Sequence, residues 1–152
     1  MGKKEIEVLK SEIAGQITDI DKIYQAIEDR KRCRNKLELE SLCLWLHNLY
    51  CAFEDLLKIV AKAFENNIMD EERYHIALLK RMTVDIKGVR PALIGTKTFH
   101  LMDELRSFRH KIRHMYVFDI DKEKMKPALE SALMLREIYQ GDIHKFFKRL
   151  KG

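Results

Sequence analysis

Isoleucine recurs every seven residues at the start of this chain, and this repeat is the strongest constraint on the fold. The repeating residues are Ile6, Ile13, Ile20 and Ile27. Other large side chains fill the intermediate spacings, namely Leu9, Ile17, Ile23 and Tyr24. Apolar residues three, four and seven apart line one face of an α-helix, whereas a half-buried strand alternates every second residue. The sequence therefore predicts a long first helix with one buried face.

The next apolar segment, LESLCLWLHNLYCAFEDLLKIVAKAF, has apolar residues on nearly every side of a helix. A helix of this kind needs neighbours all round, so we expect it at the centre of a bundle. A basic stretch over residues 29–36 separates it from the first helix. A shorter helix over about residues 70–83 follows, and then Gly88, Pro91 and Gly95 indicate a loop because glycine and proline interrupt regular structure.

Two more helices are predicted after that loop. The first could be capped by Thr96 or Thr98, because threonine is a favoured N-cap, and it ends between residues 113 and 118. The second could be capped by Asp119 or Asp121 and returns to the core. Proline is tolerated near a helix start, which fits Pro127 in that second helix.

Length and composition favour one folded unit. The 152 residues, 46% of them apolar, are enough to bury one core. We therefore predict an all-α fold, an antiparallel helical bundle of four main helices plus a shorter helix, forming a single domain over residues 1–152. The first ten residues carry charges where a signal peptide requires an apolar region, and no run of about 18 apolar residues occurs. We expect a cytoplasmic protein that does not associate with a membrane.

The three cysteines also favour a reducing compartment. They are Cys33, Cys43 and Cys51, with no CxxC spacing that would indicate a zinc site. If Cys43 and Cys51 share a helix, they lie about 12 Å apart along it, which is too far for a disulfide. We expect all three to pack in the core, where free cysteine is common.

The segment LRSFRHKIRHMY gathers cationic side chains near the end of the third main helical pattern. They are Arg106, Arg109, His110, Lys111, Arg113 and His114. On a helix the three arginines share one side, while the apolar residues of the segment point towards the core. Guanidinium groups offer a planar fork of donors to phosphate oxygens, and histidine exchanges protons near neutral pH. These are the minimum groups for cleaving a phosphodiester without a metal.

Such cleavage of RNA begins when the 2′-hydroxyl attacks the adjacent phosphorus. It needs a general base, a general acid and a cation for the charge that develops on the phosphoryl oxygens. His114 and Arg109 supply one proton-transfer group and one cation, and a symmetric dimer would bring a second histidine. The net charge of +5 also fits an acidic partner such as nucleic acid.

Other interpretations of the segment remain open. Cations favour the last turn of a helix, so the segment could be a solvated face. His110 and His114 stand four apart, as in many zinc pairs, but the neighbouring cations repel a metal, and no carboxylate follows until Asp119. We expect neither a metal nor a cofactor. The remaining histidines are expected on the surface or as satisfied core residues: His47, His75, His100 and His144.

Arg109, His114 and Tyr116 together form the pattern R-x4-H-x-Y, which resembles that of ribonuclease toxins of the HEPN superfamily. The surrounding sequence is similar to their HepT-like branch from about residue 40 to the C-terminus. The residues that carry the similarity upstream of the motif are Tyr74-His75, Leu78-Leu79, Met82, Arg90-Pro91, Leu105 and Phe108-Arg109-His110.

The resemblance implies a dimeric helical toxin that cleaves RNA, with tRNA one candidate, at a cleft formed by both copies of the motif. Arg109 and His114 would be the catalytic pair. His110 would orient His114 or contact phosphate, and the flanking arginines, Arg106 and Arg113, would support phosphate binding. The implied alternative is a non-catalytic helical module that binds nucleotides or a nucleotidyltransferase.

The resemblance also implies a partner. This is a small MNT-type nucleotidyltransferase antitoxin, which silences the toxin by transferring AMP to the motif tyrosine, in the manner of a type VII-like toxin–antitoxin pair. Tyr116 is the matching acceptor in this chain.

Overall fold

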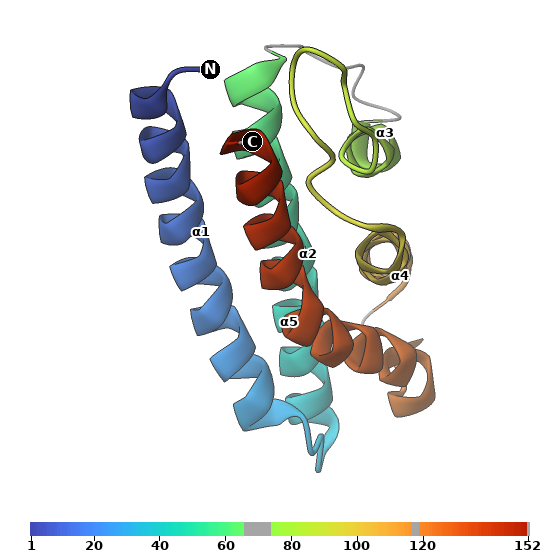
Figure 1. Cartoon of the computed structure of the whole chain (residues 1–152). Coiled ribbons are helices and arrows are strands. Elements are labelled where there is room, and N and C mark those ends of the chain that lie inside the picture. Colours follow the sequence, from blue (N-terminus) through green and yellow to red (C-terminus); the bar gives the residue numbers. More distant parts are fainter. Residues whose placement is uncertain (66–73, 117–118, 152) are drawn as a thin grey trace.

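Five helices make up the described part of the chain, which comprises residues 1–65, 74–116 and 119–151 of a computed structural model. They are α1 (Lys3–Arg30), α2 (Lys36–Phe64), α3 (Tyr74–Arg81), α4 (Thr96–Arg113) and α5 (Lys122–Lys151). Figure 1 shows them as a helical bundle, and the described residues contain no strand. The predicted all-α fold of four main helices and a shorter one is confirmed. The predicted start of the short helix, residues 70–73, lies outside the described residues.

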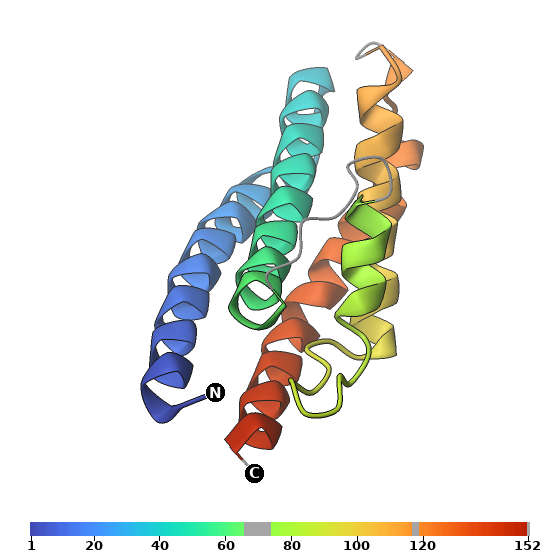
Figure 2. The same cartoon turned by 90° about the horizontal axis from the view of Figure 1, so that it is seen from above.

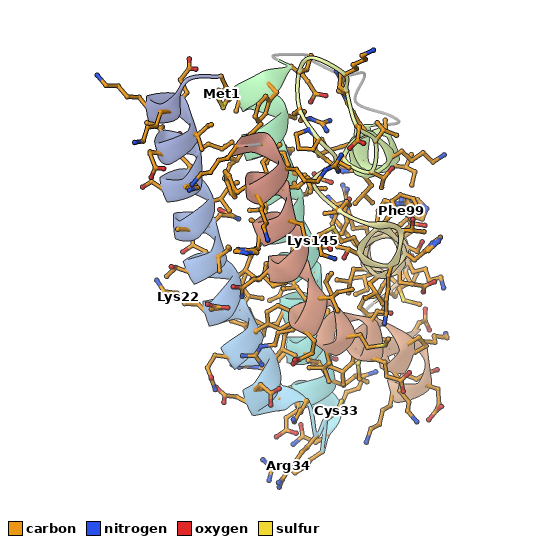
Figure 3. The ribbon with its side chains drawn as sticks, in the orientation of Figure 1. Met1, Lys22, Cys33, Arg34, Phe99 and Lys145 are labelled. Carbon is orange, nitrogen blue, oxygen red and sulfur yellow. The ribbon has the colours of Figure 1, made fainter. Side chains whose placement is uncertain are left out.

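The isoleucine repeat forms the buried face of α1, as predicted. Ile6, Ile13, Ile20 and Ile27 are all buried. The α1 helix runs antiparallel to α2, and Figure 3 labels Cys33 and Arg34 in the turn that joins them. Asn35 caps α2 by accepting a hydrogen bond from the backbone N–H of Glu38 at 2.9 Å, as its short polar side chain favours.

The α2 helix is the centre of the bundle. It packs against α1, α3, α4 and α5, and Figure 2 shows α1 on one side of it and α3 and α4 on the other. Among its buried residues are Leu42, Leu46, Leu49 and Phe53, in agreement with the apolar pattern. Burying side chains on several sides explains why α2 is the most apolar segment in the sequence.

The start of α4 is capped differently from the prediction. Gly95 is the N-cap, Thr96 is the first helical residue, and neither Thr96 nor Thr98 caps the helix. Instead, the carboxylate of Asp142 in α5 accepts hydrogen bonds from the Gly95 N–H at 2.9 Å and the Thr98 hydroxyl at 2.5 Å. A negative charge at this end of a helix is favourable because of the helix dipole. The cap thus comes from another helix.

The other predicted boundaries agree with the structure. Asp121 caps α5 by accepting from the Lys124 N–H at 2.7 Å, and Pro127 is accommodated close to the start of that helix. The α4 helix ends at Arg113, at the near edge of the predicted interval, which extends into residues outside the described part.

The loop before α4 is held by a buried arginine. The side chain of Arg90 is 0% exposed. Its guanidinium donates to Glu65 at the end of α2 at 2.8 Å and to the backbone carbonyls of Val84 and Pro91, both at 3.1 Å. It also donates to the carbonyl of Arg81 at 3.2 Å. Arg90 therefore ties the loop to the central helix and has a structural role.

The cysteines are free thiols, as predicted. Cys33 and Cys43 are buried, whereas Cys51 is half-buried. Burial, reinforced by the nearby Cys33, raises the pKa of the Cys43 thiol to about 12. Cys43 is therefore protonated and unreactive at neutral pH.

In the described ranges, no helix combines the length and the apolar composition that a bilayer crossing requires.

Candidate active site

The last turns of α4 carry the cationic segment, and their apolar side faces the core as predicted. Leu105 and Phe108 are buried. Arg109 is half-buried, and its guanidinium carbon lies 6.0 Å from the centroid of the Tyr50 ring in α2. Arg113, one turn further on, is exposed. The arginine side of α4 therefore borders α2.

Arg106 is already engaged within its own helix. Its Nε donates to Asp103 at 2.7 Å. In the part of the chain that the structure describes, Arg109 and Arg113 form no ion pair. Two guanidinium groups are thus available to an anion, and the third is partly neutralised.

His110 and His114 form a ring pair at the end of α4. Their ring centroids are 4.4 Å apart with an interplanar angle of 56°, and both side chains are exposed. His114 is the C-cap, and its N–H donates to the carbonyl of Lys111 at 3.2 Å. Both imidazoles are accessible to a substrate on the same side of the helix.

Arg109 and His114 do not meet within one chain. Five residues at about 100° each separate their directions by roughly 140° around the helix axis. No hydrogen bond joins them in the described structure.

Tyr116 lies just beyond the helix and is accessible. Its side chain is 71% exposed, which is unusual for a large aromatic residue. Its carbonyl accepts a hydrogen bond from the Asp119 N–H at 2.9 Å. The phenol is thus open to a partner protein.

Tyr50, which contacts Arg109, belongs to a group of α2 and α3 residues that the sequence did not assign to the site. The Tyr50 hydroxyl donates to Glu54 at 2.8 Å, and His75 Nδ1 lies 2.5 Å from the same carboxylate oxygen. Lys58 approaches the other oxygen at 3.4 Å. Burial raises the pKa of Tyr50, and the neighbouring Glu54 adds to this.

Glu54 is a buried carboxylate that remains ionised. Burial acts to raise its pKa, but hydrogen bonds from His75 and Tyr50, and the charges of His75 and Lys58, outweigh it and lower the pKa. An ionised carboxylate only accepts hydrogen bonds, so the facing nitrogen of His75 carries the proton. Glu54 therefore anchors contacts from two helices.

His47 also borders the arginines. Burial, and then the charges of Arg109 and Arg113, lower its pKa, so its imidazole is neutral at pH 7. Its Nε2 lies 3.8 Å from the sulfur of Cys51, and its Nδ1 is buried without a partner in the described structure. His47 and His75 are both half-buried, and the bond of His75 to Glu54 agrees with the expected satisfied core histidine.

One signal could have identified these α2 residues. His47, Tyr50 and Glu54 are three and four residues apart, so they share one face of the helix. A glutamate on a helix face that packs against neighbours is a candidate for a buried carboxylate, which needs a partner. The remaining two histidines, His100 and His144, are exposed as expected.

Metal ligands are not grouped in the described residues: no cluster of three or more His, Cys, Asp or Glu side chains could hold an ion. A hollow of about 840 Å³ in the described residues is lined by the N-terminal residues, α1 and the end of α2, and by none from α4. It is an open groove remote from the cationic segment, so volume alone does not locate the site.

A known protein family matches the part of the chain that contains the candidate site. The family model described as HepT-like protein matches residues 41–150, which include α3, α4, Tyr50, Glu54 and the entire R-x4-H-x-Y motif. No curated protein and no solved structure matches the chain.

Proposed function

This chain belongs to the HepT-like family, and on that premise we propose that it is a metal-independent endoribonuclease, the toxin of a toxin–antitoxin pair. The observation that supports this most is that Arg109 and Arg113, which have no acidic partner among the described residues, lie at the same helix end as the exposed rings of His110 and His114. An anion bound there meets both positive charge and groups that exchange protons.

The proposed reaction is internal attack on RNA. A histidine removes the proton of a 2′-hydroxyl, the oxygen attacks the adjacent phosphorus, and the 5′-oxygen leaves after it is protonated. Each proton transfer contributes about 10²–10⁴-fold. Arg109 and Arg113 would stabilise the negative charge that grows on the phosphoryl oxygens. The products are a 2′,3′-cyclic phosphate and a free 5′-hydroxyl.

We propose that the active species is a homodimer. Because Arg109 and His114 diverge by about 140° around α4, one chain offers them to different sides. A symmetric partner would place its own histidine opposite the first arginine and supply both the acid and the base. A fully active monomer at assay concentration would refute this.

Tyr116 is the proposed site of control by an MNT-type nucleotidyltransferase. Its oxygen would attack the α-phosphate of ATP, so that AMP becomes attached and pyrophosphate leaves. The exposed phenol is accessible to such a partner. The added phosphodiester charge would pair with nearby Arg113 and the nucleoside would block RNA, so modification would inactivate without unfolding.

The decisive experiment is cleavage of RNA by the purified protein in EDTA. His114→Ala and Arg109→Ala are each expected to reduce the rate at least about 100-fold. His144→Ala, which removes an exposed histidine from α5, is the matched control and should cut at the parent rate. Parent-level cleavage by His114→Ala, or products that all end in a free 3′-hydroxyl, would contradict the mechanism. A protein that binds the nucleotidyltransferase but cuts no RNA would favour the non-catalytic module.

A further inference from the structure

A continuous series of contacts leads from α3 through α2 to the motif arginine in α4. His75 contacts Glu54 at 2.5 Å, and the Tyr50 hydroxyl donates to the same Glu54 oxygen at 2.8 Å. The series ends at Arg109, whose guanidinium carbon lies 6.0 Å from the Tyr50 ring centroid. Three helices therefore meet behind one guanidinium group.

The polarity of this network is unusual for its depth. Tyr50 is 1% exposed and Glu54 is 6% exposed. Burying a carboxylate is unfavourable unless it is paired, and a well-packed apolar side chain would serve helix packing at least as well. Packing alone therefore does not account for a glutamate here.

The network acts on Arg109 in two ways. The Glu54 hydrogen bond fixes the rotation of the phenol and increases the electron density of its ring, which strengthens the attraction of the ring for a cation. Meanwhile the Nε of Arg109 is buried and has no hydrogen-bond partner in the described structure. The ring thus holds the inner part of the guanidinium, which leaves its terminal nitrogens as donors to a phosphate.

We propose that Tyr50, Glu54 and His75 are positioning residues that fix the Arg109 guanidinium for catalysis. None of them touches the substrate, and each acts through the next contact in the series. The catalytic consequence rests on the proposed ribonuclease function, whereas the fixed orientation of Arg109 does not.

The orientation is tested by NMR on the full chain. Because the Nε of Arg109 is buried, its side-chain Nε–H proton should exchange slowly with water. The Nε–H signal is assigned by its loss in Arg109→Lys. Glu54→Gln and Tyr50→Phe keep the shape of each side chain and should accelerate this exchange about tenfold. Asp55→Asn, at the exposed neighbouring position, is the matched control and should leave it unchanged.

The catalytic arm measures RNA cleavage by the same variants. Glu54→Gln and Tyr50→Phe should lower kcat by up to about 100-fold with little change in KM, because misplacement of a catalytic group affects the transition state most. His75→Asn should have a smaller effect in the same direction. In an Arg109→Lys background, Glu54→Gln should have no further effect, whereas a merely structural role would lower activity in both backgrounds.

Each outcome decides the proposal. Parent-like exchange in Glu54→Gln and Tyr50→Phe would overturn it, and so would equal acceleration in Asp55→Asn, which indicates general loosening. Faster exchange with an unchanged kcat would also overturn it. If the parent protein cuts no RNA, the proposed function fails, and the exchange measurement still decides whether the network orients Arg109.

Discussion

Replacing Arg90 with methionine should lower the free energy of unfolding by about 3 kcal/mol, at the low end of the range for breaking a buried ion pair. Methionine retains most of the volume and the apolar contacts of the arginine stem, so the loss isolates the guanidinium. The substitution removes four donated hydrogen bonds: one to Glu65 and three to the backbone carbonyls of Arg81, Val84 and Pro91.

The magnitude follows from what is left behind. Glu65, whose side chain is 5% exposed, keeps the Arg81 guanidinium at 2.8 Å, so its charge remains partly compensated. This places the loss below the upper limit of about 5 kcal/mol. The carbonyls of the loop lose their donors, at about 1 kcal/mol each where water does not replace them. A domain with 5–15 kcal/mol in all would remain folded at room temperature.

The assay is equilibrium urea unfolding followed by circular dichroism, with the slope compared between variants. Arg149→Met is the matched control, because Arg149 pairs with Asp85 of the same loop in an exposed position, and exposed pairs stabilise little. Its midpoint should stay close to that of the parent. If Arg90→Met loses no more than Arg149→Met, then the buried guanidinium does not hold the loop.

Three further outcomes follow from the structure. Because the pKa of Glu54 is lowered in the folded state, its ionised carboxylate stabilises the fold above the ordinary glutamate pKa of 4.5, and this stabilisation is lost as the pH falls through the folded pKa. Glu54→Gln should therefore make stability depend less on pH in the acid range. An unchanged dependence would refute the assignment. Asp142→Ala should cost about 1 kcal/mol by removing the cap of α4, as a thermal melt would measure. NMR titration should find the pKa of His47 below its ordinary 6.5, and Arg113→Gln should raise it; no rise would show that the charge of Arg113 does not act on His47.

Local periodicity predicted the helices because it reports which side of a helix is buried. The isoleucine repeat located α1, and the apolar run located α2 as the central helix. The cap of α4 could not be predicted in this way, because Asp142 lies 44 residues from Thr98 and no local pattern indicates which helices will be neighbours. Threonine is a favoured N-cap residue by local preference, but the carboxylate of Asp142 in α5 accepts the hydrogen bonds at this helix start.

The candidate site also has a part that local sequence predicts and a part that depends on helix packing. The cations of α4 and the His110–His114 pair are close in sequence, so their grouping could be predicted. The contact of Arg109 with Tyr50 joins residues far apart in the chain, and it depends on how α2 and α4 pack. Glu54 is plain in the sequence, but its burial and its contact with His75 in α3 required the structure.

The Asp142 contact fixes α4 at the end opposite the cationic segment. Eighteen residues lie between the anchored end and Arg113, a length of about 27 Å at 1.5 Å per residue. Such a helix is a lever: a rotation of about 5° at the anchored end moves the far end by roughly 2 Å. Because a misplacement of about 1 Å can reduce a rate 100-fold, we expect the positions of the two histidines to depend on this distant carboxylate together with the buried Leu101, Leu105 and Phe108 along α4.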